Sequence, residues 1–196
     1  KEADVNYFTT NFLSSSVFGF HEASSNDYTW PATELANAQI YLVRDELESN
    51  RAKFLLTNRD GSLLLSSSYI DEIYNDNQWV LAVRVEPEGY GVIGSVLTSS
   101  NPNYEISFYG VSHEFGQVRN EFEVSSSLNY HSGSSYLSNP KRIYAGAHRT
   151  NFTGSVLQQS DIEISSCKFW FDYLDSEELK SHSKDIKNKG VSRPTS

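Results

Sequence analysis

Alternation of apolar and polar residues is the strongest local signal along this chain, and it predicts short β-strands. In residues 79–85, Trp79, Leu81 and Val83 fall on one face while Val80 and Arg84 fall on the other. A period of two is the spacing of a strand that has two different faces. Further strands are predicted at residues 7–13, 17–21, 38–43, 54–57, 63–65, 104–111, 115–124 and 142–147.

Two pairs of these strands are predicted to form hairpins. Asp60 and Gly61 lie between the apolar runs 54–57 and 63–65, and an Asp-Gly pair in that position favours a tight turn. A second hairpin is expected around residues 112–114, between the strands on either side.

The segment 142–187 contains the clearest succession of elements. Gly146 interrupts the first strand, and a long second strand is expected where Ile162 and Ile164 alternate with polar residues before the apolar run 169–174. Asp175 and Glu178 then have the spacing of a capping box, so a short helix is predicted near residues 175–187. This is the only helix that the pattern predicts.

At least eight short strands and one terminal helix predict an all-β fold, namely an antiparallel β-sandwich of the jelly-roll type. We expect a single domain over residues 1–190, followed by a tail or linker at 191–196. The stretch 129–139, with Gly133 and several serines, is expected to be the longest irregular connection.

Charge limits the partners that the chain can have. The net charge is -9, the pI is about 5.0, and the lysines gather near the C-terminus. Nucleic acid and anionic membrane surfaces are therefore not expected as partners. No run approaches the roughly 18 apolar residues of a membrane-spanning helix, so membrane insertion is not expected either.

Cysteine and methionine content is also informative. Cys167 is the single cysteine, which excludes an intramolecular disulfide, and its strand-like surroundings predict a small buried side chain. The sequence holds no methionine and starts at Lys1, so we expect a piece of a longer chain.

Four motifs follow one another along residues 37–182. They are Asn-Gln-Trp-Val-Leu-Ala-Val at 77–83, Phe-Tyr-Gly-Val at 108–111, Arg-Ile-Tyr-Ala-Gly-Ala at 142–147, and Phe-Trp-Phe-Asp-Tyr-Leu at 169–174 with Glu177, Glu178 and Leu179. This order resembles the laminin G-like branch of the concanavalin A-like lectin and glucanase fold. Segment 142–187 and its lysine-rich tail also resemble laminin G-like modules of large bacteriophage virion proteins.

The resemblance implies a jelly roll in which Gly110 is the glycine of a hairpin turn. This chain departs from the family pattern there, because Val111 follows Gly110 and neither Asn nor Asp precedes it. It also implies binding or adhesion, and a location on a virion or an extracellular surface. Relatives of this kind often hold Ca²⁺ at the rim of the sandwich with oxygen ligands. Asp71 and Asp76 are the candidate calcium ligands here, while no cofactor is required.

Catalysis is not expected. Glucanases of the resembled fold carry acidic residues on one strand as E-x-D-x-x-E, and the best match here, residues 159–164, fails at its first and last positions. Asp161 and Glu163 do share one face of the predicted strand. That pair is typical of the wet side of a sheet. A glycan-cleaving enzyme stays open as an alternative, as does a purely structural packing domain.

Binding is the function that we expect, through loops at the rim. Aromatic rings contact the C–H face of a sugar, and polar groups fix its hydroxyls. The loops at residues 26–30 and 129–131 offer this mixture. Alternatively, the aromatic residues of the first of these loops form a lid over the core. The candidate ligand-binding residues are Asp27, Tyr28, Trp30, Tyr130 and His131. The expected partners are glycans or other protein subunits, including further copies of the chain.

Overall fold

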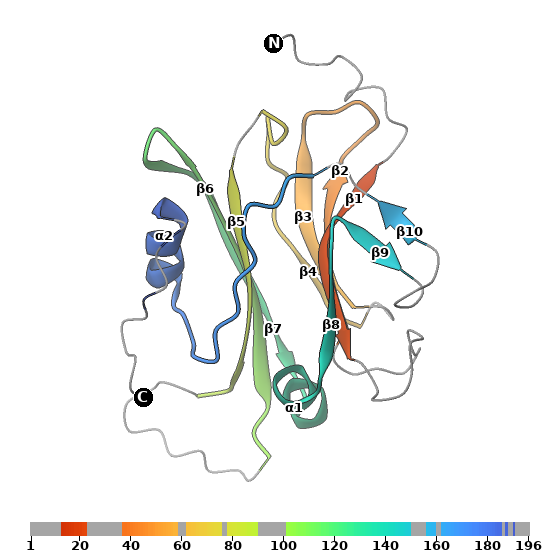
Figure 1. Cartoon of the computed structure of the whole chain (residues 1–196), viewed down its shortest axis with the longest axis vertical. Helices are drawn as coiled ribbons and strands as arrows, with labels where there is room; N and C mark the ends of the chain where they lie inside the picture. Colours follow the sequence, from red (N-terminus) through yellow and green to blue (C-terminus); the bar gives the residue numbers. More distant parts are fainter. Residues whose placement is uncertain are drawn as a thin grey trace. The chain divides into compact units, whose positions relative to one another are not determined.

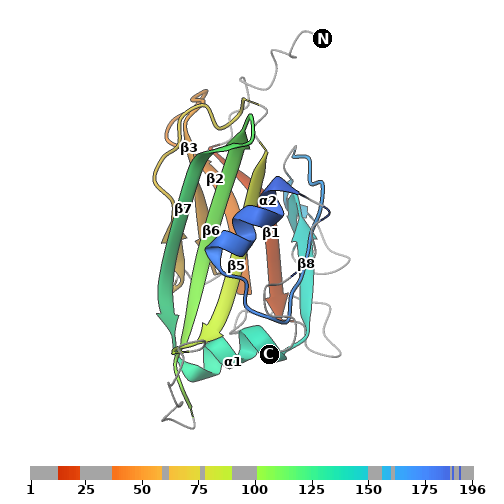
Figure 2. The same ribbon diagram turned by 90° about the vertical axis from the view of Figure 1, so that its left-hand side faces the viewer.

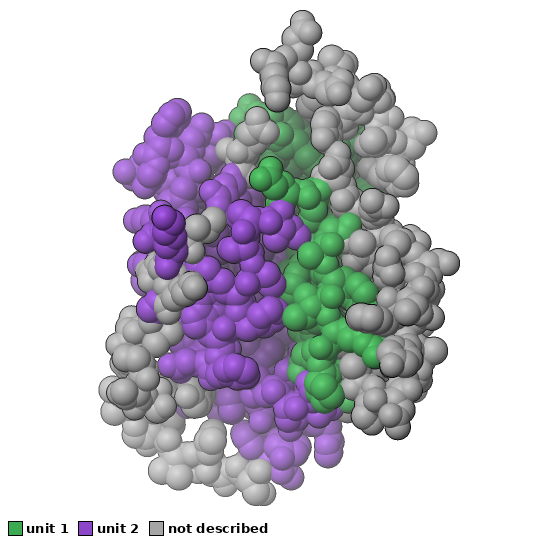
Figure 3. Space-filling view, in the orientation of Figure 1, with its two compact units in different colours: residues 1–76, 140–163 green, residues 77–139, 164–196 purple. Residues whose placement is uncertain are grey.

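The computed structural model describes residues 13–22, 37–58, 62–75, 78–89, 101–149, 156–159, 162–185, 187 and 190; of His21, 147–149 and 156–159 the backbone alone is described. The chain divides into two compact units, one of residues 1–76 with 140–163 and the other of residues 77–139 with 164–196 (Figures 1 and 3). The prediction of a single domain over residues 1–190 stays a prediction.

The first unit contains a five-stranded antiparallel sheet in the order β4-β3-β2-β1-β8. One face of this sheet is apolar, because Ile40, Phe54 and Leu56 are buried there on alternate positions of their strands. A two-stranded ribbon belongs to the same unit. The strands are β1 (Ser14–Glu22), β2 (Asn37–Arg44), β3 (Ala52–Thr57), β4 (Leu64–Ser66), β8 (Lys141–Ala145), β9 (Ala147–Arg149) and β10 (Val156–Gln159).

The hairpin predicted around Asp60 and Gly61 is confirmed in its strands. β3 and β4 are antiparallel, with Thr57 opposite Leu64. The Asn58 side chain closes the end of the hairpin, since its Oδ1 accepts from the Leu63 amide at 2.9 Å and its Nδ2 donates to Ser62 at 2.7 Å. The turn residues 59–61 themselves lie outside the described residues.

The second unit contains a three-stranded antiparallel sheet, β5 (Trp79–Pro87), β6 (Tyr104–Glu114) and β7 (Gln117–Leu128), in that order. The alternation predicted for β5 is confirmed by its register, since Ala82 lies opposite Tyr109 and Val83 opposite Phe108. The even-numbered residues of β5 and the odd-numbered residues of β6 therefore lie on the same face of the sheet. We call this the helix face, because α2 covers it (Figure 2).

The hairpin between β6 and β7 turns later than predicted. Its turn residues are Phe115 and Gly116, both with positive φ, rather than residues 112–114. Gly110 is not a hairpin glycine, because it lies within β6, where a Cβ atom would come within 2.2 Å of the Phe122 ring. A glycine is needed here for close packing of the neighbouring side chain.

The predicted C-terminal helix is confirmed as α2 (Ser176–Lys184). Asp175 accepts from the Glu178 amide at 2.8 Å, and the Glu178 carboxylate accepts from the Asp175 amide at 3.0 Å. Both halves of the capping box are therefore formed. The helix ends at Lys184 and not at residue 187.

A second helix, α1 (Tyr130–Ser138), replaces the irregular stretch that the sequence predicts at 129–139. Asn129 caps it by accepting from the Ser132 amide at 3.0 Å, and Tyr136 is buried on one side. Serine is a modest helix former, so the composition of this stretch does not favour a helix. The Asn129 cap and the buried Tyr136 side chain stabilise the helix nonetheless. The helices of the described residues are too short and too polar to cross a membrane.

The long strand predicted before α2 is absent from residues 162–174, which are described and irregular. Glu163, Ile164 and Cys167 are exposed, so the interpretation of Cys167 as a buried side chain is also wrong. A period of two describes an extended chain, but a strand also needs a hydrogen-bonded neighbour. Asp161 lies outside the described residues.

The predicted class is confirmed. The described residues form sheets of five and three antiparallel strands, a two-stranded ribbon and two short helices, which is the content of an all-β sandwich protein.

The capping box gives a direct test of α2. Replacement of Asp175 by Ala should lower the free energy of unfolding by about 1 kcal/mol, because the Glu178 amide loses its acceptor. Asp175→Asn is the matched control and should retain most of the stability, since asparagine also caps. Urea denaturation measures both, and equal losses for the two variants would contradict the assignment.

Candidate functional site

Helix α2 is seated on an apolar patch of the helix face. Tyr109, Val111, Leu174 and Leu179 are buried together, and three half-buried side chains pack against them, namely Val80, Ala82 and Trp170. This patch fixes the position from which α2 presents its polar side chains to the sheet.

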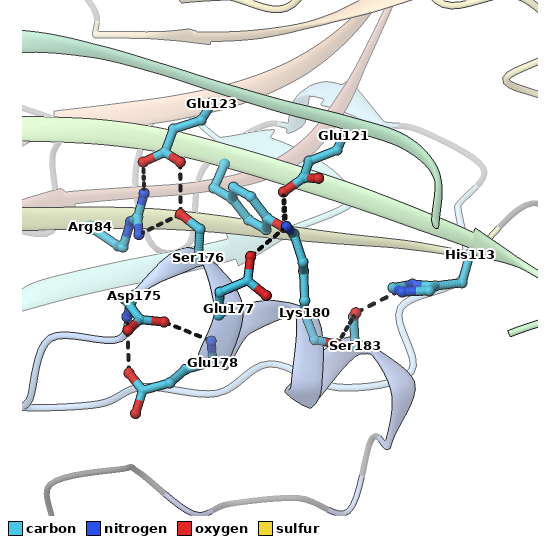
Figure 4. Close-up of polar contacts among 11 residues, drawn as sticks. Arg84, His113, Glu121, Glu123, Asp175, Ser176, Glu177, Glu178, Lys180 and Ser183 are labelled. Atoms are coloured by element: carbon cyan, nitrogen blue, oxygen red, sulfur yellow. Dashed lines mark hydrogen bonds and ion pairs between the residues drawn. The ribbon is translucent and has the colours of Figure 1, made fainter. Parts of the chain in front are cut away.

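Arg84 is the centre of a polar cluster beside that patch, and its side chain is 7% exposed. Its Nε donates to Ser107 Oγ at 3.0 Å, and its Nη1 donates to the Leu174 carbonyl and to Ser176 Oγ, both at 3.2 Å. Its Nη2 forms an ion pair with Glu123 (Figure 4). A buried guanidinium needs hydrogen-bond acceptors for its N–H groups, because an unpaired buried charge is very costly.

Glu121 forms a second polar cluster two residues along β7 from Glu123. The Tyr109 hydroxyl donates to Glu121 Oε1 at 2.9 Å, and Lys180 Nζ lies 2.9 Å from the same oxygen. Lys180 also contacts Glu177 at 2.7 Å. Burial, and then the hydrogen bond to Glu121, raises the pKa of Tyr109, so this hydroxyl stays protonated and donates.

The charges in these two clusters are matched within the protein. Burial alone raises the pKa of Glu121, but hydrogen bonds from Lys180 and then Tyr109 outweigh it and hold that pKa below its usual value. Glu123 also accepts from the Ser176 hydroxyl at 2.7 Å. Both carboxylates thus accept from donors within the protein, which suits fastening α2 to the sheet better than attacking a substrate.

His113 and Ser183 meet at the far end of α2, but not as a nucleophile and its base. Ser183 Oγ donates to the Lys180 carbonyl at 2.7 Å, and it lies 3.3 Å from His113 Nδ1. Its hydrogen is already used within the helix, so His113 is not placed to remove it.

An aromatic cluster lies at the end of the sheet where α1 begins. The Tyr104 and Tyr130 ring centroids are 6.3 Å apart, and Tyr130 and His131 meet edge to face at 5.6 Å. Gly133 permits this arrangement, because a Cβ atom there would come within 2.2 Å of the Tyr104 side chain. His131 is exposed and the two tyrosines are half-buried, so the rings offer a surface to a ligand.

The structure thus brings two predicted binding residues, Tyr130 and His131, into one cluster. Sequence reasoning missed Tyr104, because its place beside Tyr130 depends on the end of β6 meeting α1. The other predicted binding residues, Asp27, Tyr28 and Trp30, lie outside the described residues.

The calcium prediction concerns Asp71 and Asp76. Asp71 is exposed, and its carboxylate lies 3.2 Å from Arg51 Nε, a cation that would compete with a metal ion. Asp76 lies outside the described residues, among which no group of three or more His, Cys, Asp or Glu side chains is arranged to hold a metal. Calcium binding stays a prediction.

A pair of acidic residues that the sequence did not reveal lies on the helix face. Glu86 on β5 is directly opposite Glu105 on β6. Burial, and then the charge of Glu105, raises the pKa of Glu86, although Arg84 and a hydrogen bond from Tyr173 act against the increase. Only the strand register shows that these two carboxylates face each other.

Comparison with protein-family profiles, with curated proteins and with solved structures gives no match for this chain. The laminin G-like resemblance therefore stays a prediction.

The Glu86–Glu105 pair predicts a pH effect on stability. A raised pKa means that folded Glu86 binds its proton more tightly than the unfolded chain does, so its contribution to stability falls as the pH rises above the usual value of 4.5. Glu86→Gln should raise the free energy of unfolding at pH 7 by about 0.2–1 kcal/mol, the range for a cross-strand pair.

At pH 4 the same variant should match the parent protein, because Glu86 is then protonated. Urea denaturation at both pH values tests this. Glu105→Gln removes the repulsion but leaves Glu86 partly buried, so it should recover part of the gain. A gain of equal size at both pH values would contradict the explanation.

Proposed function

We propose that this chain is a non-catalytic binding module that recognises glycans through Tyr104, Tyr130 and His131. The observation that carries the proposal is the ring cluster at the end of the three-stranded sheet. Aromatic rings bind a sugar mainly by covering its C–H face, and the tyrosine hydroxyl and the histidine ring nitrogens can then bind the sugar hydroxyls.

The surroundings of the cluster suit a polar ligand. The first turn of α1 adds half-buried Ser132, and Asn129 holds that turn in place through its cap. Hydroxyl and amide groups held by the backbone are the fixed polar partners that sugar hydroxyls require.

The wider setting of the proposal comes from the resemblance stated for the sequence. A laminin G-like module within a larger virion or cell-surface protein would use such a site for adhesion. Neighbouring protein subunits are the alternative ligands, and calcium held by Asp71 or Asp76 is an optional addition.

A glycan array with and without EDTA tests the proposal. The chain should bind a subset of glycans, and Tyr130→Ala should weaken that binding about tenfold, equivalent to 1.4 kcal/mol for a lost ring contact. Tyr69→Ala is the matched control, because Tyr69 is an exposed tyrosine of the other unit. Loss of binding in EDTA would show that binding depends on calcium.

No binding in either condition would overturn the glycan proposal and favour the structural packing role. An equal loss for Tyr69→Ala and Tyr130→Ala would place the site elsewhere.

Glycan cleavage is the second candidate, and the Glu86–Glu105 pair is the observation that favours it. A raised pKa suits a general acid, and retaining enzymes use two carboxylates about 5–5.5 Å apart. However, Glu105 and Tyr104 are consecutive on β6 and project to opposite faces of the sheet. A sugar stacked on the aromatic cluster would lie away from the carboxylates, so binding without cleavage is the better-supported function.

Mass spectrometry of glycans incubated with the chain separates the two candidates. We expect the glycans to remain intact. Products that disappear with Glu86→Gln, but persist with Glu88→Gln, would establish cleavage and overturn the non-catalytic proposal.

A further inference from the structure

Arg44, the last residue of β2, is a buried cation with an unpaired guanidinium nitrogen. The residue is 8% exposed, and its Nη1 atom is buried with no acceptor within hydrogen-bond distance among the described residues. The guanidinium lies over the Tyr74 ring, with Cζ 4.5 Å from the ring centroid. A buried charge in this state is costly unless a group of opposite charge pairs with it.

Arg84 of the second unit shows how this protein satisfies a buried guanidinium. It is also 8% exposed, yet its nitrogens donate to two hydroxyls and a carbonyl and pair with the Glu123 carboxylate. Arg84 lies over an aromatic ring as well, 5.8 Å from the centroid of Tyr109. A ring therefore accompanies the acceptors of Arg84 and does not replace them, whereas Arg44 has the ring and lacks the carboxylate.

The carboxylates nearest to Arg44 along the chain and across β3 are engaged elsewhere. Asp45 lies 3.5 Å from Arg51 Nη1, and it also accepts from the Glu46 amide at 2.9 Å. Asp71 lies 3.2 Å from Arg51 Nε. Arg44 takes part in none of the ion pairs among the described residues. Its charge is therefore available to a ligand.

The backbone and the ring around Arg44 are held in place. The Arg44 amide donates to the Leu13 carbonyl at 2.8 Å. On the other side of the guanidinium, the Tyr74 amide donates to Asn50 Oδ1 at 3.1 Å, and the neighbouring Ile73 amide donates to the Asn50 carbonyl at 3.1 Å. Groups that are fixed before a ligand arrives lower the entropic cost of binding.

The surroundings of Arg44 favour a planar anion with a single charge. Ala52 lies directly opposite Arg44 on β3 and is completely buried, so one neighbour of the guanidinium is apolar. A carboxylate can accept two parallel N–H bonds from a guanidinium. Sulfate carries two charges, which cost more to remove from water, and Asp45 and Glu46 next in the chain would repel the second charge.

We propose that Arg44 binds the carboxylate group of a small ligand, with the Tyr74 ring against the guanidinium. Nη1 and a second guanidinium nitrogen donate to the two carboxylate oxygens. Because Arg44 is only 8% exposed, the carboxylate is the part of the ligand that reaches it. The site shares no residue with the cluster of Tyr104, Tyr130 and His131, so it does not depend on the glycan proposal.

A nuclear magnetic resonance titration of the whole chain tests the site. The Nε–Hε signal of Arg44, assigned by its loss in Arg44→Lys, should shift saturably with sodium acetate and sodium glucuronate. Sodium chloride and sodium sulfate at equal ionic strength should cause no saturable shift. The Arg84 signal is the internal control and should stay in place, because its acceptors are already supplied.

The two carboxylates separate a simple organic acid from an acidic sugar as the source of the group. Equal Kd values for acetate and glucuronate would assign the site to the carboxylate alone, whereas a glucuronate Kd at least tenfold lower would assign it to an acidic sugar. Absence of a saturable Arg44 shift with both compounds would overturn the proposal. An equal shift with sulfate would overturn the choice of a carboxylate.

Thermal denaturation of two charge-matched variants provides an independent test. Acetate should raise the Tm of the parent protein but not that of Arg44→Met. Lys53→Met is the matched control, because it removes one positive charge from the other face of the same sheet, and it should keep the increase. Without a carboxylate, Arg44→Met should melt no lower than the parent protein, since it removes an unpaired buried charge. A clearly lower Tm would show that Arg44 already has an acceptor in the chain and would overturn the proposal.

The ring beneath the guanidinium gives a smaller effect. Tyr74→Leu should raise the acetate Kd about threefold, as expected for the loss of one cation–π contact that orients Arg44. Tyr69→Leu is the control, since Tyr69 lies over Arg51 and Lys53 instead, and should leave the acetate Kd unchanged. Equal effects of the two variants would contradict the role of Tyr74.

Discussion

The buried guanidinium of Arg84 is the constraint on which the arrangement of the second unit depends. A cation that is almost completely buried must have acceptors close by, and they come from three separate parts of the chain: Ser107 on β6, Glu123 on β7, and the start of α2 through Leu174 and Ser176. Arg84 thereby fixes where α2 begins, and the capping box defines the first turn at the same point.

This fastening determines which chemistry remains available. Glu121 and Glu123 are two acids on one face of a strand, yet Lys180, Tyr109 and Arg84 already occupy them. Within the described part of the chain, the groups that we propose to meet a glycan lie at the other end of the sheet, where the rings of Tyr104 and Tyr130 are half-buried. Binding therefore fits the distribution of satisfied and available groups better than catalysis does.

Sequence reasoning succeeded where one local signal sufficed. Alternation located β5, and the Asp175–Glu178 spacing located α2, because each depends on residues close in sequence. The helix α1 was missed, since a buried tyrosine and a single cap outweigh its many serines. One of the three residues of the candidate site was equally out of reach: Tyr130 and His131 are visible as a polar aromatic pair, but Tyr104 joins them only through the fold.

The segment before α2 shows why apolar and polar residues can alternate as in a strand although no strand forms. Its period of two is real, since Phe169 and Phe171 are exposed while Trp170 is held against the apolar patch. What is missing is a hydrogen-bonded neighbour within the described part of the chain. The aromatic cluster around Tyr130 belongs to β6 and α1, so the glycan binding that we propose does not depend on the exposed rings of this segment.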